Sequence, residues 1–166
     1  MKLFGVRQES RDRDYPRPHE AASPPFVGRW GVLGYYLPAG LMPLDDAKRY
    51  LQGPHEGEDL YCCVGEEAPF AIVRNDAGRE FRVNPDRFIW IATPGFQLGD
   101  RVATKVGSAR IGWVAIRAWH FKRCRVYYHI DIPGAQGRKR HSRRYWENEL
   151  ELQPAVETAR GKPTDD

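Results

Sequence analysis

Aromatic and basic side chains alternate along two neighbouring runs of the sequence, from Ile111 to Trp119 and from Cys124 to Ile132. If a tight loop at about Phe121 and Lys122 joins them as a hairpin, the two-residue repeat of a strand places these side chains on one face. Rings stack on nucleobases and guanidinium groups hold phosphates, so this face is typical of a nucleic-acid surface. The predicted contact residues of the hairpin are Trp113, Arg117, Trp119, Lys122, Arg123, Arg125, Tyr127 and His129.

The opposite face of the same hairpin is apolar and predicts a core. Val114, Ile116 and Ala118 fall on it in the first run, and Cys124, Val126, Tyr128 and Ile130 fall on it in the second. An alternative interpretation stays open for the aromatic face, because large rings usually owe their place to burial. In that interpretation Trp113, Trp119 and Tyr127 pack against the first half of the chain, and the face is an interdomain seam.

A second basic cluster follows the turn at residues 133–137. Five of its seven residues are Lys or Arg, and such charges repel one another, which argues against a role in stability. Contact with phosphates or with an acidic partner explains them, while a solvated surface loop is the alternative. The basic residues of this cluster are Arg138, Lys139, Arg140, Arg143 and Arg144.

The charge of the chain is unevenly placed along its 166 residues, although the net value is only +4. Residues 24–94 carry 7 Lys/Arg against 10 Asp/Glu, or −3, whereas residues 95–155 carry 12 against 5, or +7. The second half therefore forms a basic unit joined to a mildly acidic one, and the basic unit is the expected contact surface for a polyanion.

The sequence shows no motif of a known type of active site. It lacks a nucleophile elbow, a phosphate loop, a zinc-protease motif and a dinucleotide fingerprint. Cys62, Cys63 and Cys124 form no Cys-x-x-Cys pair, and the histidines are scattered, so we expect no metal site, no cofactor and no catalytic residue. We therefore expect a binding protein and not an enzyme.

Strands and turns dominate the remaining pattern. One helix is expected near residues 41–51, with Pro43 in its first turn, a stripe of Leu41, Leu44, Ala47 and Leu51, and an end at Gly53. The expected strands are residues 30–36, 59–64, 69–74, 80–83, 88–92, 100–106, 111–119, 124–132 and 149–152. The expected divisions are a flexible N-terminal arm at 1–23, a β-rich module with the helix at 24–94, a basic module at 95–155 and a tail at 156–166.

Both modules place a short polar, single-turn element between a hairpin and a closing strand: Asn84 to Arg87 in the first and Tyr145 to Asn148 in the second. This order of parts resembles the SH3-like small barrels, which include KOW, Tudor and bacterial SH3-like modules, and it is best over residues 99–152. It also resembles segments of bacterial proteins of uncharacterised function. The resemblance implies two tandem small β-barrels. The core expected in the second is Val102, Val114, Ile116, Val126, Tyr128, Ile130 and Leu150.

Small barrels of this kind bind nucleic acid, peptides or proteins, so the fold alone does not choose a ligand. We expect the basic module to contact nucleic acid or a ribonucleoprotein surface. The alternative is a protein-interaction factor, such as an immunity-type inhibitor or an accessory subunit. No stretch is long and apolar enough for a membrane span or a secretion signal, so a cytoplasmic location without membrane partners is expected.

Overall fold

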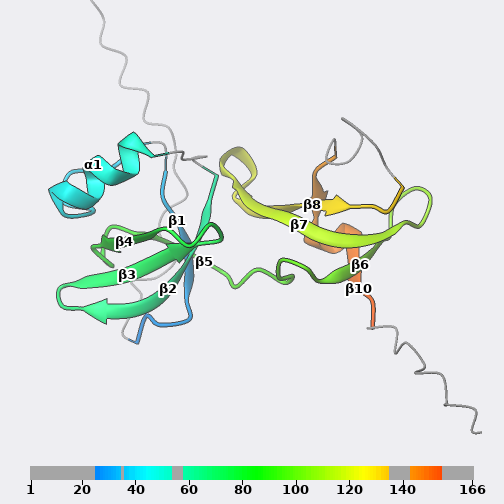
Figure 1. Ribbon diagram of the computed structural model, residues 1–166, viewed down its shortest axis with the longest axis horizontal. Helices are drawn as coiled ribbons and strands as arrows, with labels where there is room; N and C mark the ends of the chain where they lie inside the picture. The colour runs from blue at the N-terminus through cyan, green and yellow to red at the C-terminus, as the bar shows by residue number, and fades with distance from the viewer. Residues whose placement is uncertain (1–24, 35, 54–57, 135–142, 155–166) are drawn as a thin grey trace, which may run out of the picture.

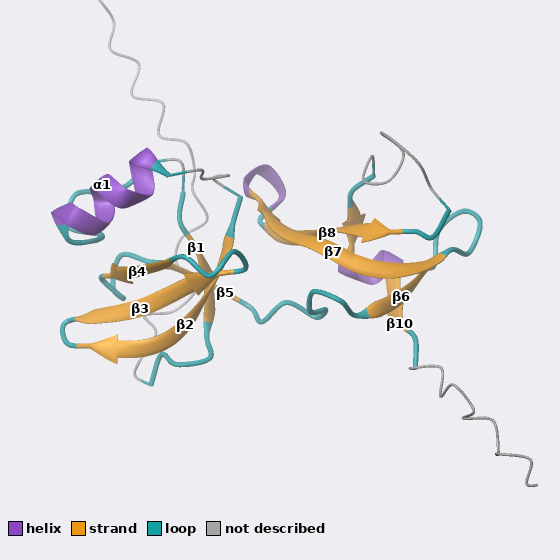
Figure 2. Ribbon diagram, in the orientation of Figure 1, coloured by secondary structure: helices purple, strands orange, loops and turns teal. Residues whose placement is uncertain are grey.

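The computed structural model describes residues 25–34, 36–53, 58–134 and 143–154, and it is built mainly of two five-stranded antiparallel sheets (Figure 1). Figure 2 shows the two sheets side by side, with the α-helix against the first sheet and short helical turns at the second. Mainly-β structure with one short helix agrees with the prediction. The arm at 1–23 and the tail at 156–166 lie outside the described residues.

The first sheet has the strand order β4-β3-β2-β1-β5. The turn predicted between β3 and β4 is present, because the Gly78 amide donates to the Asn75 carbonyl and Gly78 has a φ of 80° that suits glycine. Phe81, Val83 and Phe88 are buried in one core beneath this sheet. The strands are β1 (Trp30–Val32), β2 (Leu60–Glu67), β3 (Phe70–Asn75), β4 (Glu80–Val83) and β5 (Ile89–Ile91).

The helix α1 (Leu44–Gln52) ends at Gly53, as the sequence predicts. It begins later than predicted, because Pro43 is its N-cap and not part of its first turn, and Leu41 lies outside it. The predicted apolar stripe is wrong, because Leu44 and Leu51 are exposed. The buried face of α1 instead consists of Asp46 and Tyr50, one turn apart. A search for apolar residues at helical spacing misses a face of this kind because half of it is a carboxylate.

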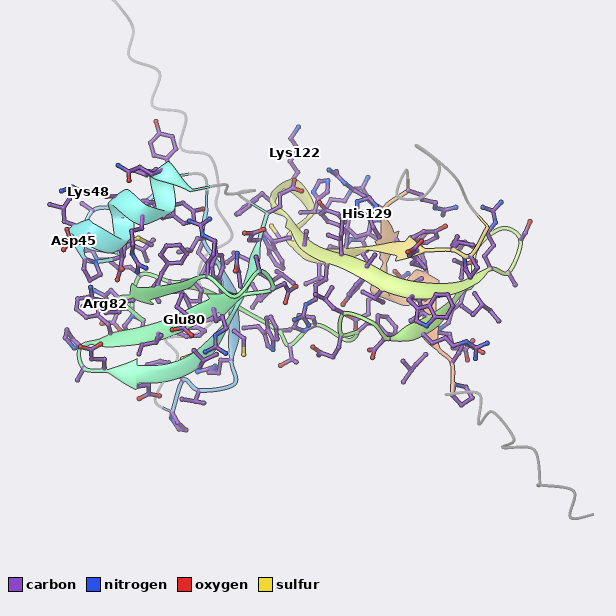
Figure 3. The ribbon with its side chains drawn as sticks, in the orientation of Figure 1. Asp45, Lys48, Glu80, Arg82, Lys122 and His129 are labelled. Atoms are coloured by element: carbon purple, nitrogen blue, oxygen red, sulfur yellow. The ribbon has the colours of Figure 1, made fainter. Side chains whose placement is uncertain are left out.

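Asp46 attaches α1 to the sheet. Its carboxylate accepts a 2.8 Å hydrogen bond from Nε of Arg82 on β4, and it also accepts from Arg49 on α1. Burial raises the pKa of this carboxyl, but the hydrogen bonds from the two guanidinium groups outweigh burial and hold the pKa below its ordinary value. The first module therefore has its only described helix fixed at one end of the sheet, away from the second module (Figure 3).

The second sheet has the order β10-β6-β7-β8-β9. This order repeats that of the first sheet, because in each sheet the last strand along the chain pairs with the earliest one: β5 with β1, and β10 with β6. The short helical element η3 (Glu147–Glu149) before the last strand is present as predicted. Tyr145–Trp146, predicted as part of a turn, is a short strand. The elements are β6 (Arg101–Thr104), β7 (Ile111–His120), η1 (Phe121–Arg123), β8 (Arg125–Asp131), β9 (Tyr145–Trp146) and β10 (Leu150–Leu152).

A β-bulge in β7 changes which side chains face the core. Val114 pairs with Ile130, but the next pair joins Ile116 to His129, so Ala115 is an extra residue. Ile116, predicted in the core, is 42% exposed and that prediction is wrong. Val126 packs only partly against the core. Cys124, predicted on the same face, is exposed, and Ala118 is buried but pairs with Tyr127 on the other face, so these two placements are wrong. The predicted core residues confirmed as buried are Val102, Val114, Tyr128, Ile130 and Leu150.

The two sheets come from separate stretches of chain, 30–91 and 101–152, and the predicted division between residues 94 and 95 falls in the segment that joins β5 to β6. Closure of either sheet into a barrel stays a prediction. Within the described residues, no helix has the length and the apolar character needed to cross a membrane.

The bulge predicts different responses at two apolar positions of β7 that are only two residues apart. Val114→Asp should unfold the second sheet, because its carboxylate would be buried without a partner at a site that is 2% exposed. Ile116→Asp should lower the free energy of unfolding by only about 1–2 kcal/mol, because the side chain is 42% exposed and the carboxylate stays hydrated, although Asp is disfavoured in a strand. Urea titration followed by circular dichroism measures both, and a large loss for Ile116→Asp would contradict the bulge register.

Candidate functional site

The bulge at Ala115 divides the predicted aromatic face of the hairpin into two groups. Beyond it, Arg117 pairs with Tyr128 and Trp119 pairs with Val126, so both share the inner face with core residues. Arg117 and Trp119 are 8% and 7% exposed, and their predicted place on an outward contact face is wrong. Regular alternation fails here because one inserted residue moves every later side chain to the other side.

Arg117 lies in the seam between the two sheets. Its Nε and Nη2 donate to the two carboxylate oxygens of Asp76, at 2.8 and 2.6 Å, and its Nη1 donates to the Gln97 side chain. The guanidinium carbon lies 4.2 Å from the ring centroid of Trp30 on β1. A bidentate carboxylate and an aromatic ring together satisfy the guanidinium in this buried position.

Trp119 completes the seam from the second sheet. Its side chain packs in one cluster with Val32 and Leu60 of the first sheet, and its backbone N–H donates 2.8 Å to the carbonyl of Glu58. The alternative interpretation as an interdomain seam is therefore correct for Trp119. It is wrong for Trp113, whose side chain is 44% exposed on β7.

Four rings gather on the outer face of β7, β8 and β9, and we call them the ring cluster: His120, Tyr127, His129 and Trp146. Tyr127 lies at the centre, with ring centroids 6.2 Å from His120, 5.6 Å from His129 and 6.4 Å from Trp146. It is 5% exposed, and its hydroxyl donates to Glu58 from the first module. Tyr127 is therefore the buried member of the ring cluster, and it also contacts the first module.

Three guanidinium groups lie over these rings. The guanidinium carbon of Arg125 is 3.7 Å and that of Arg123 is 5.5 Å from the Trp146 centroid, and that of Arg144 is 4.7 Å from the Tyr127 centroid. Contact with a ring face restricts the guanidinium without neutralising its charge. Arg144 also approaches Glu58, at 3.8 Å.

Sequence reasoning missed His120 and Trp146 as members of the site. Trp146 was assigned to a turn, but it pairs with Tyr127 across β8 and β9, and His120 pairs with Arg125 at the end of the hairpin. The signal in the sequence was the residue type of Trp146 and its place next to a basic loop, because bases and guanidinium groups stack on tryptophan. The sequence did not predict the strand register of His120 or Trp146.

The other predicted contact residues are spread around this face. Figure 3 shows Lys122 extending from η1 into solvent and His129 on β8. Arg143 is exposed, but its Nη2 lies 3.3 Å from Glu149 and its guanidinium lies over Tyr145, so the structure places it beside β9 and not in the ring cluster. Arg138, Lys139 and Arg140 lie outside the described residues.

A cleft of about 830 Å³ opens between the modules, next to the ring cluster. Its first wall comes from Arg29 and the end of β5, and its second wall comes from the hairpin end and η3. Arg125 lines the cleft and also lies over Trp146, so the two features share a cation. The lining residues are Arg29, Trp90, Ile91, Ala92, Thr93, Trp119, Cys124, Arg125, Val126, Glu147 and Asn148.

The cysteines show no sign of activation. Burial raises the pKa of the Cys62 and Cys63 thiols, which is the opposite of what a nucleophilic thiolate needs. Cys124 is exposed, and it adopts a left-handed φ of 48° where η1 turns into β8. In the described part of the chain, no three His, Cys, Asp or Glu side chains are grouped so that they could hold a metal ion.

Comparison with known proteins finds one family model, which matches residues 42–151 and is described as a family of unknown function, DUF6960. No curated protein and no solved structure matches the chain.

The seam predicts a strong dependence of stability on Asp76. Asp76→Ala should lower the free energy of unfolding by about 3 kcal/mol, because it leaves the Arg117 cation buried without its carboxylate. Adding Arg117→Met should recover part of this loss, since the uncompensated charge is then removed. Glu80→Ala, which breaks the exposed pair with Arg74, is the control and should cost less than about 1 kcal/mol. Equal losses in urea titrations of Asp76→Ala and Glu80→Ala would contradict a buried ion pair.

Proposed function

The chain belongs to DUF6960, a family of unknown function, and we propose that it is a non-enzymatic protein whose second module binds nucleic acid, free or on a ribonucleoprotein surface. The observation that carries this proposal is the set of guanidinium groups over the ring cluster, from Arg123, Arg125 and Arg144. A cytoplasmic location, without a membrane partner or a cofactor, is part of the same proposal.

We propose in addition that each sheet is an SH3-like small barrel, and two features support this. Both sheets have the same order, with the fifth strand returning to the first. The two edge strands of each sheet also contribute to one core, as Val83 on β4 and Trp90 on β5 do in the first, and Tyr145 on β9 and Leu150 on β10 do in the second. A sheet whose opposite edges share a core is strongly curled.

The arrangement of the cations favours phosphate binding. Lys122, Arg123 and Arg144 are exposed, and Arg125 is half-buried against Trp146. Ring contacts hold the guanidinium groups in place before a ligand arrives, which lowers the entropy lost on binding. Phosphates attract such cations regardless of base sequence, so the expected binding is sensitive to salt and tolerant of sequence.

A second candidate function, the protein-interaction factor, rests on a different part of the same face. Ile111, Trp113 and Ile116 on β7 are each more than 40% exposed, at 44%, 44% and 42%. Exposed apolar side chains along one strand are typical of protein contacts. An immunity-type inhibitor or an accessory subunit would use this stripe, and the basic residues beside it would select an acidic partner.

Removal of two cations from the ring cluster should weaken nucleic-acid binding of all sequences alike. For Arg123→Gln/Arg144→Gln we expect the log-log slope of affinity against salt to fall by about 0.7 per lost contact on a single strand. Fluorescence anisotropy of labelled oligonucleotides from 50 to 300 mM salt measures this. Phosphate contacts dominate the affinity over about this range of salt concentration.

The matched control is Lys105→Gln/Arg110→Gln, which removes the same charge from the loop between β6 and β7, where both residues are exposed. Its slope should stay close to that of the parent. Equal effects of the two double variants would show attraction by net charge alone. If the folded parent binds neither DNA nor RNA at low salt and captures a specific protein instead, the protein-interaction function replaces this proposal.

A further inference from the structure

The cleft between the modules has the composition of a site for a planar, negatively charged ligand. In the first module the guanidinium carbon of Arg29 lies 5.7 Å from the Trp90 centroid, and Arg125 and Trp119 line the opposite side of the cleft. Thr93 and Asn148 are exposed and add hydroxyl and amide groups to the lining. Trp90 and Trp119 are only 4% and 7% exposed, so little of either ring is open to a base. The accessible lining offers Arg29 and Arg125 for phosphates, and Thr93 and Asn148 for hydrogen bonds to base edges.

We propose that this cleft receives one or two unpaired nucleotides of a single-stranded nucleic acid, whose flanking phosphates lie on Arg29 and Arg125. This inference rests on the proposed function and names the form of nucleic acid that the site selects. A volume of about 830 Å³ lies within the range of pockets that hold small organic ligands, so it accommodates bases but not a duplex.

The position of Arg125 connects the cleft to the ring cluster. Its guanidinium lies over Trp146 on the outer face, and the residue also lines the cleft. In this proposal, a strand whose phosphates contact Arg123 on the outer face enters the cleft at Arg125. Duplex DNA can use the outer face, but its bases are paired and stacked and cannot enter the cleft without being extruded.

The rigidity of both walls supports insertion of a base. Trp90 is held by a stacked contact with Phe26 and by a 2.9 Å hydrogen bond from its Nε1 to the Pro85 carbonyl. Trp119 is 7% exposed, and its indole Nε1 is among the few buried polar side-chain atoms of the described residues that have no hydrogen-bond partner. This nitrogen is itself buried, so Trp119 supports the wall of the cleft and is not a contact for the ligand.

The experiment compares a fluorescein-labelled single-stranded oligothymidylate with a fluorescein-labelled G·C-rich hairpin duplex of the same number of phosphates, by anisotropy at about 50 mM salt, where phosphate contacts are strong. Arg29→Gln should weaken single-strand binding about fivefold, the order expected for one lost phosphate contact at low salt, and leave duplex binding within about twofold. Arg87→Gln removes an exposed arginine of the same module that contacts the Ala39 carbonyl, outside the cleft. It is the matched control and should change neither affinity.

A second pair of variants tests the cleft without altering an arginine. Ala92 is exposed and lines the cleft, so Ala92→Glu adds a carboxylate where the phosphates are expected and leaves the core intact. It should weaken single-strand binding about tenfold by repulsion at short range. Ala109→Glu adds the same charge to the exposed loop between β6 and β7 and should have little effect.

The outcomes separate this inference from the proposed function. If the parent binds both probes and each cleft variant matches its control on the single strand, the cleft inference is overturned and the proposed function stands. Equal losses on the single strand and the duplex would make Arg29 a general phosphate contact, which also overturns base insertion. Competition by polyglutamate as strong as that by unlabelled oligothymidylate would show selection of negative charge and not of nucleotides, which also overturns base insertion. Absence of binding to both probes would overturn both proposals.

Discussion

The ion pair between Arg117 and Asp76 fixes how the two sheets meet, and the surfaces considered for binding depend on it. Arg117 belongs to the second sheet, while Asp76 lies in the β3–β4 turn and Trp30 on β1 of the first. The Arg117 guanidinium is 8% exposed, and a buried guanidinium needs partners for its donors. Asp76 supplies them only where the two sheets meet in this position. The pair thus favours one relative position of the modules over a range of them.

The bulge at Ala115 is the local feature that makes this ion pair possible. Without the extra residue, Arg117 would face outward with Tyr127, and Ile116 would take an inner position. The bulge therefore exchanges an apolar core residue for a cation that faces the first module. The same change leaves His120 on the outer face beside Trp146. One inserted residue in β7 thus positions both the seam and the ring cluster.

The sequence predicted the parts of the fold that depend on short-range patterns. Runs of strand-forming residues and turn signals located nine of the ten strands in the described part of the chain, and Gly53 located the end of the helix. Tertiary pairing decided the rest: the bulge could not be recognised because Val114 and Ile116 have the same apolar character, and Trp146 has too few regular neighbours to indicate a strand. Of the predicted contact face, Arg125 and His129 lie on the outer side as expected, whereas Trp119 belongs to the seam.

Small β-modules present mostly convex or flat surfaces, which favour broad and weak electrostatic contact with a polyanion. Two such modules held in one fixed position create something that neither has alone, a concave site with a wall from each. Here Arg29 and Trp90 form one wall and Arg125 and Trp119 the other, and Trp119 also packs in the seam. Because the same tryptophan closes the seam and lines the cleft, any change that loosens the seam also changes the cleft. The stability of the seam and the shape of the cleft are therefore coupled through Trp119.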